Sequence, residues 1–167
     1  MSANQWTYTT RVIPGQIARA RWRNTLVYRV NPDLQVGVEY NPLATSGNVG
    51  PLVNWRVLRE AEGQPAIILG TSSDRIGTPT GQAYYFTVSK TVTKGVGLYV
   101  GASYSQFENR ILIPFGASFQ FDDHWSSILA YDGVNFHPTL SYGWDRYSVT
   151  LIYANTRYPG LSMSVGF

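Results

Sequence analysis

Large apolar residues alternate with small or polar residues along the C-terminal third of the chain. Between Ile111 and Phe121 the odd positions are apolar, and the even positions include glycine, serine and glutamine. The same alternation recurs over residues 125–132, 136–144, 147–154 and 161–167. A period of two is typical of a β-strand whose two faces meet different environments. These segments therefore predict five successive strands.

The rest of the chain carries weaker versions of the same pattern. It predicts strands near residues 96–105, 82–90, 65–73, 51–60, 34–41, 17–31 and 4–12. Some pairs are joined by short turns, at 31–33, 62–64, 93–95, 122–124 and 145–146, whereas the connections 41–50 and 73–81 are longer. This gives about twelve strands. Ten is the alternative, because the faces of 65–73 are ambiguous and the first strand is weakly patterned.

The two faces of these strands indicate which side meets water. The apolar face of the five C-terminal strands carries no charge, and the opposite face is mostly small or polar. A soluble β protein would bury its large residues and expose charge. No apolar run reaches the roughly 18 residues of a spanning helix, and only helices and closed barrels satisfy the backbone in lipid. We therefore expect an all-β fold, a transmembrane antiparallel up-and-down β-barrel, as one domain over residues 1–167.

Tight turns at one barrel end and looser loops at the other are typical of outer-membrane barrels, whose short turns are periplasmic. An even strand number then places the N- and C-termini at the periplasmic end. Charged residues make up 14% of the chain, against about 25% in ordinary soluble domains, and cysteine is absent, which suits an oxidising periplasm. We expect localisation in the outer membrane. The start Met1-Ser2-Ala3-Asn4 shows no signal peptide, so we expect a mature or engineered form.

Aromatic residues gather at the predicted strand ends. Phe121, Trp125, Trp144, Tyr147 and Phe167 lie at the tight-turn ends of outward rows. Aromatic side chains form belts at both interfaces of a bilayer. We expect these five to lie at the membrane interface.

The last residues resemble a known family. The ending Leu161-Ser-Met-Ser-Val-Gly-Phe167 alternates and closes on phenylalanine, and it resembles the C-terminal strand of bacterial outer-membrane β-barrel proteins. The resemblance implies the barrel-assembly machinery as a partner. It covers the final strand as a motif and says nothing about function.

Arginines dominate the charge. The net charge is +3, with eleven arginines and two lysines. If 17–31 is one strand with Ala18, Ala20, Trp22, Leu26, Tyr28 and Val30 outward, its arginines face the lumen. The same rule predicts a basic lumen lining of Arg11, Arg19, Arg21, Arg23, Arg29, Arg56 and Arg110, with Glu39 and Asp132 as acidic partners. Such a lining either favours anions at a constriction or forms an ion-pair network that fills the barrel.

The sequence offers little for catalysis. His124-Trp125-Ser126 resembles the His-x-Ser spacing of outer-membrane phospholipases, but it falls in a tight turn at the wrong end for outer-leaflet lipid. His137 is expected on the lumen face near Asp132, in a structural role. We expect no catalytic residues, no metal site and no cofactor, and no motif points to nucleic acid.

The leading hypothesis is an outer-membrane barrel that is either a narrow, weakly anion-favouring pore or a structural barrel with a side-chain-filled lumen. The alternatives are an adhesion or binding protein acting through loops 41–50 and 73–81, or a lipid-modifying enzyme. The expected surroundings are a lipid bilayer or detergent, and we expect a monomer.

Overall fold

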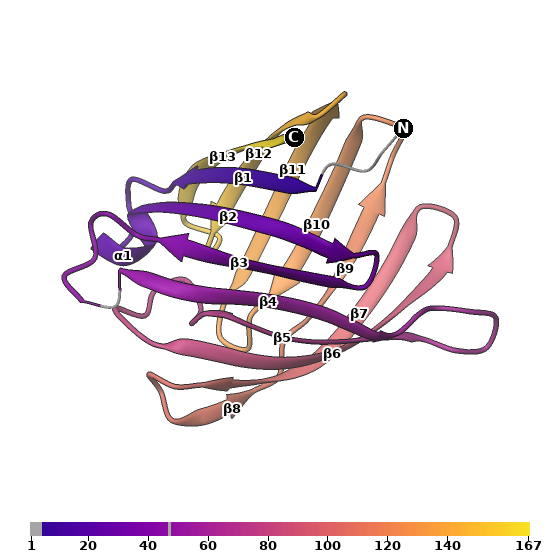
Figure 1. Cartoon of the computed structure of the whole chain (residues 1–167), viewed down its shortest axis with the longest axis horizontal. Coiled ribbons are helices and arrows are strands. Elements are labelled where there is room, and N and C mark those ends of the chain that lie inside the picture. Colours follow the sequence, from indigo (N-terminus) through magenta and orange to yellow (C-terminus); the bar gives the residue numbers. More distant parts are fainter. Residues whose placement is uncertain (1–4, 47) are drawn as a thin grey trace.

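A computed structural model describes residues 5–46 and 48–167. The expectations for residues 1–4, namely the start of the first strand and the absence of a signal peptide, lie outside this range. The described chain is built almost wholly from antiparallel strands (Figure 1). It contains no helix long and apolar enough to span a bilayer.

The strands follow one another along the chain with one short helical turn between the first two. Their bounds are β1 Trp6–Val12, α1 Ala18–Arg21, β2 Trp22–Asn31, β3 Leu34–Tyr40, β4 Val49–Leu58, β5 Ala66–Ser73, β6 Gln82–Thr93, β7 Val96–Ser105, β8 Arg110–Leu112, β9 Phe115–Gln120, β10 Trp125–Tyr131, β11 Phe136–Trp144, β12 Tyr147–Ala154 and β13 Tyr158–Gly166.

Each strand pairs with its neighbours in sequence, and the first and last strands close the ring. β1 pairs with β13, and the backbones of Trp6 and Phe167 exchange two hydrogen bonds of 2.9 Å. β8 and β9 both pair with β7 and are separated by Ile113 and Pro114, so they are two halves of one barrel strand. Proline has no N–H to give to the ladder, which explains the interruption. The fold is therefore a closed barrel of twelve antiparallel strands, as expected, and ten strands is wrong.

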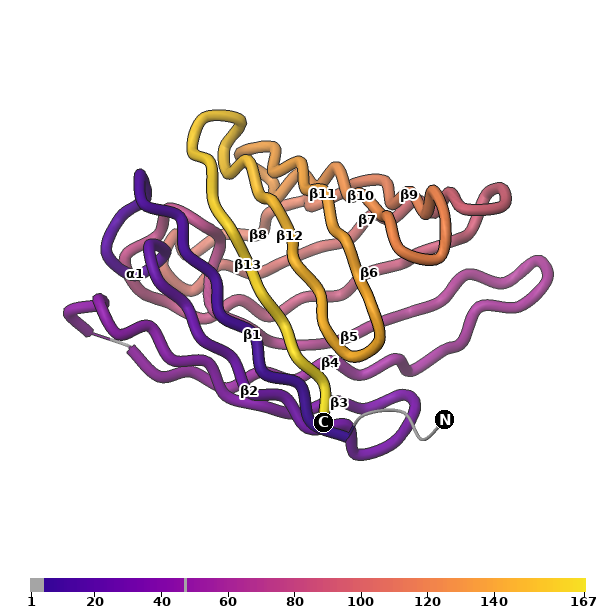
Figure 2. The backbone as a smooth tube through the Cα atoms, turned by 90° about the horizontal axis from the view of Figure 1, so that it is seen from above, coloured from indigo at the N-terminus to yellow at the C-terminus, as the bar shows by residue number. Residues whose placement is uncertain are grey.

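The two ends of the barrel differ. One end, which we call the turn end, holds the connections 32–33, 59–65, 94–95, 121–124 and 145–146 together with the start of β1 and the end of β13 (Figures 1 and 2). The other, the loop end, holds the connections 13–21, 41–48, 74–81, 106–109, 132–135 and 155–157. The long loops all belong to the N-terminal half. Which end is periplasmic stays a prediction.

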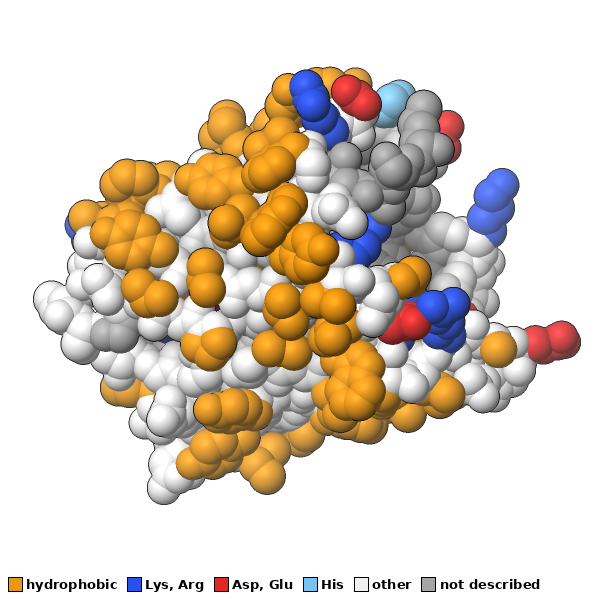
Figure 3. All heavy atoms as spheres, viewed as in Figure 1, with side chains coloured by type: hydrophobic (Ala, Val, Ile, Leu, Met, Phe, Trp, Pro, Cys, Tyr) orange, Lys and Arg blue, Asp and Glu red, His pale blue; other side chains and the backbone are white. Residues whose placement is uncertain are grey.

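The two faces of the wall have the predicted chemistry. Leu140 of β11 lies opposite Leu151 of β12 on the outer face, whereas the neighbouring pair Ser141 and Thr150 shares a hydroxyl hydrogen bond of 2.8 Å on the inner face, which we call the lumen face. Hydrophobic side chains spread over the outside of the strands, and most of the charged ones in this view lie toward the turn end (Figure 3). The apolar side of the alternation is thus the outside of the barrel.

Aromatic side chains occupy the outer face at both barrel ends. Phe121, Trp125, Trp144, Tyr147 and Phe167 are all exposed at the turn end, and Trp144 stacks on Tyr147 at 5.8 Å. Trp6 and Tyr28 add a further pair there, with ring centroids 4.7 Å apart. Their position suits a bilayer interface, which stays a prediction.

Candidate functional site

The strand register decides which predicted arginines share the lumen face. Arg11 of β1 lies directly opposite Arg23 of β2, and both point to the side that carries Glu39 of β3. Arg29 lies on the same face toward the turn end, where it pairs with Gln35. Arg56 is also there, with its Nε 2.9 Å from Asp33. These four arginines are placed as the alternation predicts.

Arg110 lies on the lumen face by register but sits at the rim. It shares its face with the buried Leu112, yet its side chain is 56% exposed and pairs with Glu108 at 2.8 Å. Arg110 therefore belongs to the loop end rather than to the barrel interior.

Arg19 and Arg21 do not lie in a strand. The expected strand over 17–31 begins only at Trp22, because residues 13–21 form a loop that contains the helical turn α1. In this turn the Arg21 N–H donates to the Ile17 carbonyl at 2.9 Å. Arg21 is exposed and donates from Nε to the Gln16 carbonyl, so its placement in a lumen row is wrong.

Arg19 reaches from this loop to the β5–β6 loop. Its Nε donates to the Thr78 carbonyl at 2.7 Å, and its Nη2 donates to the Asp74 and Arg75 carbonyls and to the Thr78 hydroxyl at 2.5–3.0 Å. Arg19 and Thr78 are both buried, and Ile13 and Ala20 of the same loop are buried with them. Burial lowers the pKa of the Arg19 guanidinium, and the nearby Glu39 and Asp74 carboxylates oppose that shift. One side chain thus ties two loops together at the loop end.

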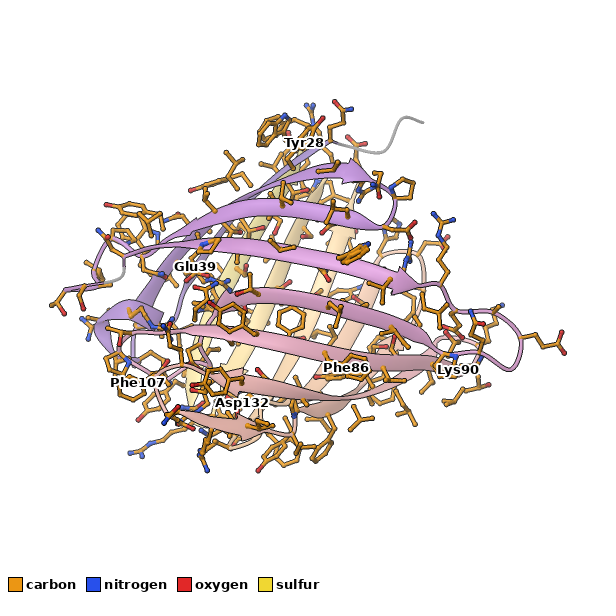
Figure 4. All side chains as sticks on the ribbon, turned by 60° about the horizontal axis from the view of Figure 1, so that its bottom comes forward. Tyr28, Glu39, Phe86, Lys90, Phe107 and Asp132 are labelled. Carbon is orange, nitrogen blue, oxygen red and sulfur yellow. The ribbon has the colours of Figure 1, made fainter. Side chains whose placement is uncertain are left out.

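The acidic partner Glu39 is buried beside Arg23. Its Oε2 accepts from Arg23 Nε at 2.9 Å and Nη2 at 2.6 Å, and its Oε1 accepts from Asn41 Nδ2 at 2.7 Å. In Figure 4, Glu39, Phe107 and Asp132 lie at one end of the barrel and Lys90 at the other. The predicted acid–base pairing of Glu39 is thus present, with Arg23 as the partner.

Asp132, the second predicted acid, is bound to His137 instead of an arginine. His137 Nε2 lies 2.8 Å from Asp132 Oδ2, and His137 Nδ1 accepts from the Asn155 N–H at 3.2 Å. Burial raises the pKa of Asp132, but the bonds from His137 and from the Asn135 and Val134 backbones outweigh it, and the net shift is downward. Both ring nitrogens are therefore engaged, which fits the structural role expected for His137.

The other histidine contacts the backbone of a neighbouring strand. His124 lies exposed in the β9–β10 turn, with Nδ1 2.9 Å from the Gly143 carbonyl. Within the described ranges neither histidine is hydrogen-bonded to a serine, and no group of three metal-ligating side chains comes together.

Three charged residues of the loop end, Asp74, Arg75 and Glu108, are not predicted by the strand pattern. Buried Asp74 accepts from the Ser105 hydroxyl at 2.6 Å, and Arg75 is paired with Glu108, which also binds Arg110. These residues lie in connections between strands, where side chains do not alternate between two faces, so the sequence pattern does not indicate where they point. Loops 74–81 and 106–109 are therefore folded against the barrel mouth rather than projecting as adhesive arms.

The charged side chains surround a cavity of about 290 Å³ at the loop end. Its wall includes Arg11, Arg19, Arg23, Asn41, Asp132 and His137. A second cavity of about 240 Å³ shares Ser73, Asp74, Arg75 and Asp132 with it. The two cavities adjoin beneath the loops. We call the first one, which has arginines on its β1–β2 side, the loop-end cavity.

Two large lumen side chains lie flat against the wall. Any side chain at Gly70 would clash with the Tyr85 ring, and any at Gly116 would meet the Tyr99 ring at 2.7 Å. The Tyr85 hydroxyl also donates to the Val53 carbonyl at 3.2 Å. Glycine at 70 and 116 therefore lets these rings cover the wall instead of crossing the lumen.

Comparisons with known proteins agree with the fold. No protein-family model and no curated protein sequence matches the chain. Among solved structures, one described as "KdgM porin" matches with a TM-score of 0.62 and 15% sequence identity, over 97% of this chain and 98% of that chain. The similarity spans the whole barrel and shows a fold shared with this porin.

Proposed function

We propose that the chain is a narrow outer-membrane pore that favours small anions. The observation that carries the proposal is the placement of Arg11, Arg19 and Arg23 around one cavity in the path through the loop end. Positive side chains in a low-dielectric channel draw anions and repel cations. The fold shared with a porin and the tyrosines lying flat on the wall support an open path.

A structural barrel with a filled lumen is the second candidate. Arg19 bridges two loops at the mouth, and Arg23 is neutralised by Glu39. Side-chain networks of this kind can fill a small barrel. A measurement of ion conductance distinguishes the pore from the structural barrel with a filled lumen.

Single-channel recording in planar bilayers with a KCl gradient tests the proposal. We expect a small conductance and a reversal potential that is shifted toward the equilibrium potential of chloride. The double variant Arg11→Gln/Arg29→Gln removes two lumen charges without breaking an ion pair of the described structure, and it should reduce the anion preference, more strongly at low salt.

The matched control is Arg146→Gln/Arg157→Gln, which removes the same net charge from two exposed residues outside the strands. Arg146 lies in a turn and Arg157 in a loop, each 5.4–5.5 Å from a tyrosine ring centroid. This variant should keep the parent reversal potential. A folded parent barrel that never conducts rules out the pore and leaves the structural barrel.

A further inference from the structure

Arg11 differs from the other arginines of the loop-end cavity. Its Nε has no exposed surface and no hydrogen-bond partner, and no nitrogen of its side chain donates a hydrogen bond to residues 5–46 or 48–167. Arg19, Arg23 and Arg75, which line the same cavity, each donate at least two side-chain hydrogen bonds. An arginine held in a wall without an acceptor leaves strong donors unsatisfied.

The nearby carboxylates are already occupied. Glu39 uses one oxygen for Arg23 and the other for Asn41. Asp132 uses Oδ2 for His137 and Oδ1 for two backbone N–H groups. Asp74 accepts from Ser105 and from two backbone N–H groups. Among the residues that the structure describes, no acid is therefore dedicated to Arg11.

The register adds a repulsion. Arg11 and Arg23 are directly opposite partners on neighbouring strands and face the same side. Like charges in directly opposite positions destabilise a strand pair. Arg23 is balanced by Glu39, so the excess positive charge rests on Arg11.

We propose that the loop-end cavity binds one small oxyanion, a carboxylate or phosphate group, on Arg11. A guanidinium presents a planar fork of donors that matches such groups. The cavity of about 290 Å³ exceeds several-fold the roughly 30 Å³ that one water occupies in the liquid, so the group fits with its waters. The site rests on the proposed pore function in one respect, because it would be a binding site for the permeating anion. Anion binding itself does not require conduction.

Titration of the detergent-folded protein with inorganic phosphate, at constant ionic strength against chloride, tests the site. Isothermal calorimetry and the thermal unfolding midpoint are the readouts. The parent should bind phosphate and gain stability, since a ligand that binds only the folded state raises the midpoint. Arg11→Gln should weaken binding at least tenfold, and Arg146→Gln should bind like the parent.

Two further measurements separate a binding role from a structural one. In phosphate-free chloride, Arg11→Gln should be at least as stable as the parent, because it removes the like-charge pair. Arg11→Lys keeps the charge but loses the fork, so its affinity should fall between those of the parent and Arg11→Gln. Equal phosphate responses in the parent and Arg11→Gln, or none in either, would overturn the site. Binding without conduction would instead sustain the site and remove the pore.

Discussion

Neighbouring residues of one strand face different solvents, and β10 shows this with two side chains of similar size. Leu129 lies opposite Pro138 and Ala117 on the outer face, and Ile128 lies opposite Thr139 and Ser118 on the lumen face. Their exposures are 42% and 43%. Exposure alone therefore cannot tell lipid from lumen, whereas the register can.

Arginine substitution at these two positions gives opposite expectations. Leu129→Arg should destabilise the barrel in a bilayer by about 2–4 kcal/mol if the position lies near mid-depth, because the charge meets hydrocarbon. Ile128→Arg places the same side chain in the lumen and should cost much less. Urea unfolding in lipid vesicles, followed by tryptophan fluorescence, measures both. Equal losses would mean that the assignment of faces is wrong.

Asp33 makes the turn end sensitive to acid. Hydrogen bonds from Arg59, with a further one from Arg56, lower the pKa of Asp33 to about 2, although partial desolvation opposes the shift. A carboxyl whose folded pKa is depressed stabilises the fold above its unfolded pKa of about 4 and loses this effect as the pH falls toward 2.

The parent should thus exceed Asp33→Asn slightly in stability at pH 6, and the difference should vanish near pH 2. The effect is small because the site is open to solvent. Unfolding midpoints in detergent at the two pH values check it. Asp123→Asn is the control, since exposed Asp123 has no side-chain hydrogen bond or ion pair to the described residues. A pH-independent gap between the parent and Asp33→Asn would contradict the linkage.

At the scale of single elements, the loop 13–21 is packed at the mouth of the barrel. It buries Ile13, Gln16, Arg19 and Ala20, although it contains only one helical turn of regular structure. A turn of four residues has little stability of its own. Its position depends on tertiary contacts, chiefly the four bonds that Arg19 donates to the β5–β6 loop.

Replacing Arg19 should therefore release this loop. A hydrogen bond to a charged group contributes about 1.5–3 kcal/mol, so Arg19→Gln should lower the free energy of local opening by at least about 2 kcal/mol. Hydrogen exchange of the amides in 13–21 should accelerate, and conductance should rise if the loop narrows the path. Arg21→Gln, which removes one bond from an exposed residue of the same turn, should leave both unchanged. Slow exchange retained in Arg19→Gln would show that packing alone holds the loop.

How far the sequence predicts the site depends on the element. Alternation identified the faces of β1, β2 and β4, and hence the lumen positions of Arg11, Arg23 and Arg56, because a strand repeats its environment every second residue. It failed at 17–21, where alanines and arginines also alternate but the backbone coils into a turn. Asp74, Arg75 and Glu108 lie in connections, where alternation gives no information, and only the tertiary fold brings Asp74 to Arg19 and Arg75 to Glu108.

At the scale of the whole molecule, the outer surface forms an apolar belt between two aromatic bands. On β11, Phe136 marks the loop end and Trp144 the turn end. They are about 27 Å apart along the strand, or about 20 Å along the barrel axis for a tilt of roughly 40°. An apolar band of roughly 25 Å is typical of barrels that span an outer membrane.

This belt predicts that the barrel folds only with an amphiphile. Trp55, Phe86, Leu98, Leu151 and Met163 are between 41% and 57% exposed on separate strands around the wall. Monomeric soluble proteins rarely expose contiguous apolar patches beyond a few hundred Å², and this belt surrounds the barrel. Dilution from urea into detergent above its critical micelle concentration, or into vesicles, should give a β-rich circular dichroism spectrum and a compact species that migrates faster than the heated protein on unboiled gels. Dilution into plain buffer should give aggregate. A monodisperse, β-rich monomer in plain buffer would contradict the membrane assignment, because it would show that the barrel is stable with its apolar belt exposed to water.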